Sequence, residues 1–179
     1  MRIIGGTHRG RIIERVGRDT TRETADMVKL AVFNMIGVNM HGNVLDLFAG
    51  SGAYGLESIS RGAEHAYLVD HDKKAYQTII SNAKKLDMIS FVTVVNQDYQ
   101  KFMDTLTESI LFDYVFLDPP YDMNVYEKII TKLSPRLHED SFIVCESKKS
   151  NILPDTIGNL SKIKDKTYGI KRISIYQKT

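Results

Sequence analysis

The sequence predicts an α/β fold in which a mostly parallel, seven-stranded sheet is covered by helices and ends in an antiparallel C-terminal edge. Short apolar runs alternate with amphipathic stretches of helical period between residues 43 and 146, as expected when crossover helices join parallel strands. A glycine-rich turn follows the first run at residues 50–55, and a carboxylate lies at the end of each of four runs. With 179 residues, of which 42% are hydrophobic and 26% charged, the chain is long enough for one good core.

The first 19 residues are expected to form a short extension, with the main domain spanning residues 20–179. Two β-prone runs, Arg2-Ile3-Ile4 and Arg11-Ile12-Ile13, flank a glycine-containing turn, which predicts a β-hairpin. Such a hairpin is too small to be stable by itself. Residues 1–18 hold five arginines and one acid, a net charge of +4, so we expect the extension to face a polyanion.

A helix is predicted over residues 21–36. Thr20 and Glu23 have the spacing of a capping box. Apolar side chains then recur at helical spacing between Val28 and Ile36, which gives the segment one apolar face.

The region from residue 43 to residue 146 is predicted to contain five parallel strands and four helices. We expect strands over residues 44–48, 66–69, 91–95, 114–117 and 141–146. Helices are expected over residues 53–61, 73–86, 99–107 and 124–133. Two further strands, over residues 160–164 and 169–177 with a turn near Lys166, break the alternation and predict the antiparallel edge.

The turn after the first strand has the pattern Gly50-x-Gly52-x-x-Gly55, which has two interpretations. In a dehydrogenase such a turn faces the pyrophosphate of a dinucleotide. In an enzyme that uses S-adenosylmethionine (SAM), the methionine end and the ribose of the cofactor lie there. Asp46 favours SAM, because a carboxylate attracts the ammonium group of SAM and repels a pyrophosphate. We therefore expect Asp46, Phe48, Gly50 and Gly52 to bind the cofactor.

Carboxylates also lie at the ends of the next predicted strands. The carboxyl ends of parallel strands meet at one edge of a sheet, where ligands bind. Asp70 ends the second strand, where a carboxylate receives ribose hydroxyls, and its competitor Asp72 is also explained as a helix cap. Asp98, after the third strand, is expected to accept a hydrogen bond from the adenine amino group, with a helix cap as the alternative.

The fourth strand is followed by Asp118-Pro119-Pro120-Tyr121, the most specific motif in the chain. Two prolines fix the backbone and remove two N–H donors, so the loop presents carbonyl oxygens and the Asp118 carboxylate. These acceptors suit the –NH₂ group of a nucleobase, because hydrogen bonds to Asp118 and to the Pro119 carbonyl stabilise the positive charge that develops during methyl transfer. Tyr121 offers a ring on which a base that has left its stack can lie.

Composition and charge narrow the choice of compartment and partner. The five histidines are dispersed and Cys145 has no partner, so we expect no metal site. A single cysteine favours a reducing compartment, and the chain shows no signal segment or membrane-length apolar run, so we expect a cytoplasmic protein without a membrane partner. Residues 145–179 carry a net charge of +5, which indicates either a second contact with a polyanion or a merely solvated basic surface.

These residues resemble those of a known class of enzyme. The run Asp46-Leu-Phe-Ala-Gly-Ser-Gly together with Asp118-Pro-Pro-Tyr is similar to the Rossmann-like class I SAM-dependent methyltransferases that act on amino groups. Within that class the chain resembles the RsmD family across residues 1–147. The shared elements are the start Met1-Arg-Ile-Ile-Gly-Gly, the Arg9-Gly-Arg element, Thr21-Arg22-x-Thr24-x-Asp26-x-Val28-Lys29 and Phe33-Asn34. Glu23 and Met27 depart from the family, which usually has proline and arginine there.

The resemblance implies a specific reaction and substrate. The RsmD family methylates N2 of a guanine in bacterial 16S rRNA, which implies SAM as the cofactor and the 30S subunit or its assembly intermediate as the partner. We expect Arg2, Arg9 and Arg11 of the hairpin to contact rRNA phosphates, Asp118, Pro119 and Tyr121 to act at the reacting amine, and the protein to be a monomer.

Three other functions remain open at this point. A methyltransferase acting on adenine N6 in DNA or RNA, or on protein glutamine, uses a similar loop, although a DNA enzyme usually needs a separate recognition domain. An NAD-dependent oxidoreductase is supported by the glycine pattern alone. A non-catalytic RNA-binding module is supported by the basic ends.

Overall fold

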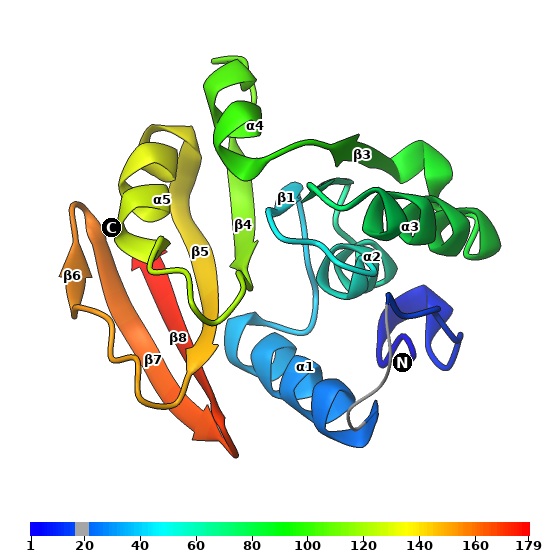
Figure 1. The fold of residues 1–179 in the computed structure, drawn as a ribbon, viewed down its shortest axis with the longest axis horizontal. Helices are drawn as coiled ribbons and strands as arrows, with labels where there is room; N and C mark the ends of the chain where they lie inside the picture. Colours follow the sequence, from blue (N-terminus) through cyan, green and yellow to red (C-terminus); the bar gives the residue numbers. More distant parts are fainter. Residues whose placement is uncertain (17–21) are drawn as a thin grey trace.

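The computed structural model describes residues 1–16 and 22–179 and contains one eight-stranded sheet in the order β3-β2-β1-β4-β5-β8-β7-β6 (Figure 1). The strands are β1 (Asn43–Asp46), β2 (His65–Asp70), β3 (Val92–Asn96), β4 (Phe112–Leu117), β5 (Leu137–Lys148), β6 (Thr156–Ile157), β7 (Leu160–Tyr168) and β8 (Lys171–Lys178). The α-helices are α1 (Arg22–Ile36), α2 (Ala53–Ser60), α3 (Lys73–Lys85), α4 (Tyr99–Thr105) and α5 (Tyr126–Leu133). Three 3₁₀ helices are η1 (Gly6–His8), η2 (Ile89–Phe91) and η3 (Ser134–Arg136).

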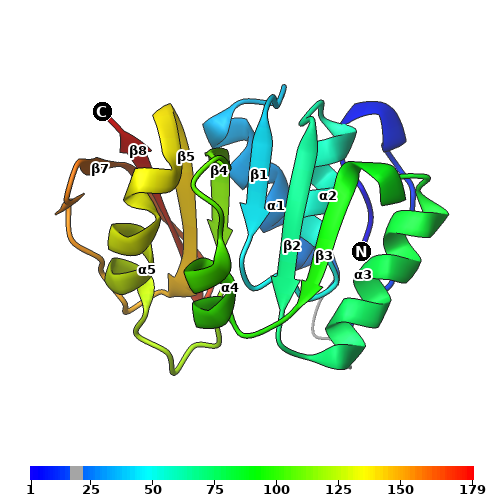
Figure 2. The same cartoon turned by 90° about the horizontal axis from the view of Figure 1, so that it is seen from above.

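The sheet has the predicted mixture of parallel and antiparallel pairing. Strands β1 to β5 pair in parallel, and β5, β8, β7 and β6 pair antiparallel. The order of strands reverses where β1 meets β4, so the carboxyl ends of these two neighbours border the topological switch point (Figure 2). Ligands of open α/β sheets bind beyond that point.

Two hydrophobic clusters hold the helices on the sheet. One contains buried side chains of α1, α2 and α3 together with Ile3 and Ile13 of the N-terminal segment. The other contains buried side chains of α4 and α5. Helices therefore cover both faces, as crossover connections between parallel strands require.

The N-terminal segment, residues 1–16, reverses direction as predicted but forms only one isolated antiparallel bridge, between Arg2 and Ile12. The ladder does not extend because the backbone N–H of Ile4 donates to the carboxylate of Glu57 on α2, at 2.9 Å. The turn itself contains η1 and packs against the end of the same helix. The segment is thus attached to the main body through buried polar contacts.

The C-terminal edge differs from the prediction in two details. The turn predicted near Lys166 is wrong: β7 continues to Tyr168, and the chain reverses at Gly169, whose φ of +58° is the left-handed conformation that glycine adopts without strain. The sheet also has one strand more than predicted, because the two residues of β6 pair with β7. Two residues are too few to show an alternating pattern in the sequence.

Two remaining findings concern the helices. The capping pair predicted at Thr20 and Glu23 stays a prediction, because Thr20 lies outside the residues that the structure describes. Among the described residues, no helix is both long enough and apolar enough to cross a membrane.

Candidate active site

The turn between β1 and α2 is shaped by glycines in the left-handed region. Gly50 has a φ of +57° and Gly52 a φ of +85°, conformations that other residues adopt at a cost. A Cβ built on Gly50 would meet no atom within 4 Å, so the turn is open to a ligand there. At Gly55 a Cβ would lie 2.0 Å from the side chain of Leu68, so this third glycine allows α2 to pack closely on β2.

Asp46 is a buried carboxylate at the end of β1, with 2% of its surface exposed. It accepts a hydrogen bond of 3.2 Å from the backbone N–H of Gly55. Burial, aided by the charges of Asp70 and Glu146, raises the pKa of Asp46 to about 7. A buried carboxylate with an elevated pKa is poised to gain a cationic partner.

Asp70 connects the end of β2 to the glycine turn. Its Oδ2 accepts a hydrogen bond of 2.8 Å from the N–H of Gly50, and its Oδ1 accepts one of 2.9 Å from the N–H of Asp72. Each carboxylate oxygen has a further lone pair, so Asp70 retains acceptor capacity for hydroxyl donors.

Asp98 and Asp72 both have the helix-capping contacts that sequence reasoning allowed. The Asp98 carboxylate accepts from the backbone N–H groups of Gln100 and Lys101 at the start of α4. The Asp72 carboxylate accepts from the N–H of Lys74 at the start of α3.

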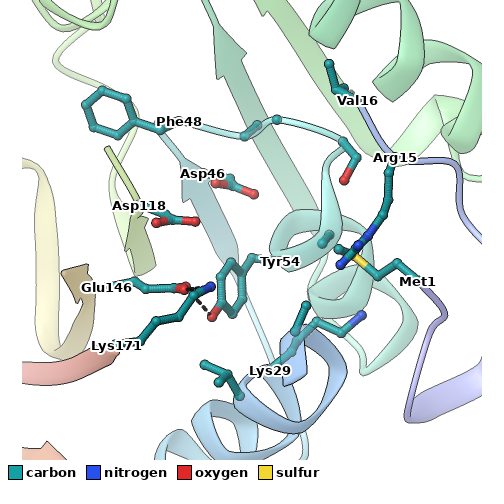
Figure 3. Close-up of a pocket in the computed structure, with 16 residues that line it drawn as sticks. Met1, Arg15, Val16, Lys29, Asp46, Phe48, Tyr54, Asp118, Glu146 and Lys171 are labelled. Carbon is teal, nitrogen blue, oxygen red and sulfur yellow. Dashed lines mark hydrogen bonds and ion pairs between the residues drawn. The ribbon is translucent and has the colours of Figure 1, made fainter. Parts of the chain in front are cut away.

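Two cavities meet at Phe48, whose side chain lines both. The larger, of about 360 Å³, is bordered by Asp46, Asp118, Gly50 and Lys29 among others (Figure 3). The smaller, of about 180 Å³, is bordered by Asp70, Asp98 and Tyr99 among others, and the rings of Phe48 and Tyr99 lie 5.1 Å apart. The structure thus brings five of the six predicted cofactor residues, all except Gly52, to the walls of these two cavities.

The loop after β4 carries the predicted amine-binding residues. Asp118 lines the larger cavity, Pro119 is buried, and Tyr121 is 40% exposed. Burial raises the pKa of Asp118 well above its usual value, and the neighbouring charge of Glu146 raises it further. Among the described residues, none donates a hydrogen bond to the Pro119 carbonyl.

Sequence reasoning missed a three-residue cluster on the wall of this cavity. The hydroxyl of Tyr54 donates to Glu146 Oε2 at 3.0 Å, and Lys171 Nζ donates to Glu146 Oε1 at 2.5 Å (Figure 3). The rule that found four carboxylates at strand ends also applies to Glu146 near the end of β5. No pattern in the sequence pointed to Lys171, because only the antiparallel pairing of β8 with β5 brings this residue close to Glu146.

The arginines predicted to bind RNA lie apart from these cavities. The N–H of His8 donates to Ser60 Oγ at 3.0 Å, and Ser60 ends α2, so the tip of the N-terminal segment lies toward the amino ends of the strands. Arg2 and Arg9 line a separate cavity of about 380 Å³ beside α1, while Arg11 donates to a backbone carbonyl of α3. The two ends of the segment, Met1 and Arg15, border the larger cavity instead (Figure 3).

Lys29 is a second site residue that sequence reasoning did not identify. It is 3% exposed, borders the larger cavity, and donates to the carbonyl of Arg2 at 2.7 Å while forming an ion pair of 3.1 Å with Glu57. Burial lowers the pKa of Lys29, against the opposing attraction of Glu57. This contact fixes the N-terminal segment over the cavity.

The donor set fits SAM and disfavours a dinucleotide. An ammonium group is the natural partner of the buried Asp46 carboxylate, whereas a pyrophosphate beside it would face an uncompensated negative charge. The smaller cavity combines aromatic rings with the carboxylates of Asp70 and Asp98, which suits an adenosine. Among the described residues, no group of three or more His, Cys, Asp or Glu side chains is placed to hold a metal ion.

The fold and the site define a class I SAM-dependent methyltransferase. Comparison with known proteins gives the family. The family model described as "Conserved hypothetical protein 95" matches residues 1–177. The putative rRNA methyltransferase YlbH of Bacillus subtilis is 40% identical over 182 residues, which cover 99% of each chain. The ribosomal RNA small subunit methyltransferase D of Escherichia coli is 34% identical over 181 residues, 99% of this chain and 90% of the relative.

Solved structures agree with this assignment. The structure described as the putative methyltransferase yhhF from Escherichia coli has a TM-score of 0.81 at 33% identity, and the match covers 99% of this chain and 97% of that one. The chain belongs to the Conserved hypothetical protein 95 family, the RsmD family, and the prediction made from its sequence motifs is confirmed.

Proposed function

We propose that the protein transfers the methyl group of SAM to the exocyclic N2 amine of a guanine in 16S rRNA of the small ribosomal subunit. One observation carries this proposal: the Asp118 loop borders the same cavity as the buried Asp46 at the neighbouring strand end, so an amine acceptor and a cofactor site open into one space. The names of the two relatives support this choice of substrate, because both specify rRNA and that of the Escherichia coli protein also specifies the small subunit.

In this proposal the cofactor is held along the strand ends. Asp46 pairs with its ammonium group, Gly50 and Gly52 provide close backbone approach, and Asp70 accepts hydrogen bonds from the ribose. Phe48 and Asp98 border the cavity assigned to the adenine. The bound cofactor supplies an electrophilic methyl group on a sulfonium centre.

The Asp118 loop positions and polarises the target amine. Asp118 and the Pro119 carbonyl accept its two N–H bonds, which directs the nitrogen lone pair away from the ring and stabilises the developing positive charge. Burial raises the pKa of Asp118 and by itself favours the neutral carboxyl. The positive charge that develops on the bound amine favours the ionised carboxylate, which accepts the hydrogen bond. Tyr121 is exposed beside the loop and provides a ring for the unstacked base.

The proposal also covers the organisation of the chain around the RNA. Residues 1–19 act as an RNA-facing extension of a methyltransferase domain spanning residues 20–179. Arg2 and Arg9 are exposed and line one cavity between this extension and α1, apart from the cavity that receives the target base, and they contact rRNA phosphates together with Arg11. The substrate is the 30S subunit or its assembly intermediate, the protein acts as a monomer, and the reaction takes place in the cytoplasm.

The test is a methylation assay on 30S subunits from cells that lack this enzyme. Tritium from methyl-labelled SAM should appear in 16S rRNA, and nucleoside mass spectrometry should identify N2-methylguanosine. Label in N6-methyladenosine would replace the guanine assignment by its main alternative. Absence of label from both the 30S subunit and its assembly intermediates would contradict the proposed function.

A further inference from the structure

A basic groove lies beside Tyr121, outside the two cavities described above. It has a volume of about 680 Å³ and is formed by the end of β5 and the turn between β7 and β8. Its walls include Tyr121, Lys148, Lys149, Ile170 and Arg172. None of the described residues that line it carries a carboxylate. The groove therefore presents a positive surface next to the loop that holds the target amine.

Backbone contacts make this groove a fixed feature. The N–H of Lys149 donates to the carbonyl of Ile170 at 2.8 Å, which closes the end of β5 on the neighbouring turn. Arg172 donates to the carbonyl of Lys149 at 2.9 Å and pairs with Asp165 at 2.7 Å, so its charge is already compensated. Lys148 and Lys149 are exposed and pair with no described carboxylate, so they supply the charge available to a ligand.

The groove also exposes apolar surface between its charges. Ile170 in the turn is 73% exposed and Tyr121 is 40% exposed, and both line the groove. A surface that served solubility alone would not place a large aliphatic and an aromatic side chain among lysines. Stacking or apolar surfaces combined with cations are characteristic of sites that bind single-stranded nucleic acid.

The groove and the catalytic cavity are bordered by neighbouring residues of the chain. Tyr121 belongs to the Asp118 loop and borders the groove. Lys171, between Ile170 and Arg172 in the chain, borders the catalytic cavity and binds Glu146 there. These neighbouring residues put the groove beside the cavity that receives the target base.

We propose that this groove binds the single-stranded RNA that flanks the target guanine. Lys148 and Lys149 contact phosphates, and Ile170 and Tyr121 pack against a neighbouring base. The inference rests on the proposed rRNA substrate and adds a second contact surface, separate from the cavity that Arg2 and Arg9 line. It also assigns a role to the positive charge of residues 145–179.

The test compares Lys148→Ala/Lys149→Ala with a control variant, Lys128→Ala/Arg136→Ala, which removes the same charge from α5 and from η3 at the other end of β5. Affinity for deproteinised 16S rRNA is measured by filter binding at several salt concentrations. We expect the groove variant to bind several-fold more weakly, with a slope of log affinity against log salt that is less steep by about 1.4, the value for two phosphate contacts on a single strand. The control variant should retain the wild-type slope. Ile170→Glu, which places a negative charge in the groove, should bind RNA more weakly than both the groove variant and the control variant.

The same variants are then assayed for methylation of 30S subunits. The groove variant should show a raised KM for subunits and an unchanged Kd for SAM. Wild-type RNA affinity and slope in the groove variant would overturn the inference, even if the enzyme methylates 30S subunits normally. A loss seen with 30S subunits and absent with naked rRNA would also overturn it, because the groove would then contact a ribosomal protein. Failure of the wild-type enzyme to methylate any subunit would instead contradict the proposed function, independently of the RNA-binding comparison.

Discussion

The hydroxyl of Tyr54 donates a hydrogen bond of 3.0 Å to Oε2 of Glu146, which connects the first turn of α2 to the carboxyl end of β5. The Tyr54 ring also stacks on Phe116 of β4, with centroids 4.7 Å apart and an interplanar angle of 10°. The helix that begins at the glycine turn is thereby fixed to the two strands that border the Asp118 loop. In the proposed function, the relative positions of the cofactor and the amine therefore depend on this contact.

Replacing Tyr54 by phenylalanine keeps the stacked ring and removes the hydrogen bond. The buried Glu146 oxygen would then lack a donor, which should lower the free energy of unfolding by about 1–3 kcal/mol. We also expect lower turnover, because Glu146 borders the cavity beside Asp118. Tyr76→Phe is the matched control, since the Tyr76 hydroxyl has no hydrogen-bond partner among the described residues. Equal denaturation midpoints for both variants would show that the Tyr54 bond is not stabilising.

Replacing Asp70 by alanine should weaken SAM binding by about 1–3 kcal/mol, because hydrogen bonds to a charged acceptor are lost. The substitution also frees the N–H of Gly50, which Asp70 holds at 2.8 Å in the turn. Asp72→Ala is the control: it removes the cap of α3 and should lower the melting temperature without changing SAM affinity. Calorimetric titration of both variants with SAM distinguishes the two roles. Unchanged affinity in Asp70→Ala would exclude Asp70 as the ribose ligand.

Protonation of Asp46 should couple folding to pH. Its folded-state pKa of about 7 lies above the value of about 3.9 expected in the unfolded chain, so the native protein binds more protons between these values. The contribution of Asp46 to stability is therefore present below about pH 4 and is lost as the pH rises through about 7. Melting temperatures of the cofactor-free protein should show this loss, and Asp46→Asn should reduce it. If the melting temperatures of the wild type and of Asp46→Asn change with pH in the same way, the pKa of about 7 does not belong to Asp46.

The same carboxylate should couple SAM binding to proton release. The ammonium group of SAM favours ionised Asp46, so binding below pH 7 should expel a proton and affinity should rise as the pH approaches the Asp46 pKa of about 7. Calorimetry in two buffers with different ionisation enthalpies measures that proton. Asp46→Asn should bind SAM weakly and without proton release.

Removing the arginines of the N-terminal segment should weaken binding to rRNA while leaving the SAM site intact. The triple variant Arg2→Ala/Arg9→Ala/Arg11→Ala should bind 16S rRNA with a shallower salt dependence, because each lost phosphate contact reduces counterion release. The control removes three exposed lysines elsewhere, Lys101, Lys128 and Lys164. A triple variant with full activity on 30S particles would contradict a role for these arginines.

Much of the fold could be predicted because local patterns determine it. The alternation of apolar runs and helical stretches predicted β1 to β5 and the helices between them along the chain, and most of the glycines and strand-end aspartates expected to bind ligands line cavities at the strand ends. Lys171 could not be found in this way, because only the antiparallel pairing of β5 with β8 places it beside Glu146. The pattern of residues along the chain does not show which residues of β5 and β8 pair with each other.

The N-terminal segment shows a second limit of sequence reasoning. Its two β-prone runs predicted a hairpin, yet the buried Glu57 carboxylate captures the N–H of Ile4 and Gly5, which a longer ladder would need. Glu57 itself is 0% exposed and pairs with Lys29 and Arg61. A buried polar network of this kind depends on three segments at once, so no single segment predicts it.

The most direct test of the proposed chemistry is the single-turnover methylation rate of Asp118→Asn on 30S subunits. Asparagine keeps the shape and one carbonyl acceptor, but it loses the charge that stabilises the developing ammonium and can present its own –NH₂ to the target amine. We expect the rate to fall on the order of a hundredfold, as for the loss of a preorganised transition-state contact. SAM affinity and melting temperature should remain close to those of the wild type. A wild-type rate in Asp118→Asn would contradict the amine-polarising role of Asp118.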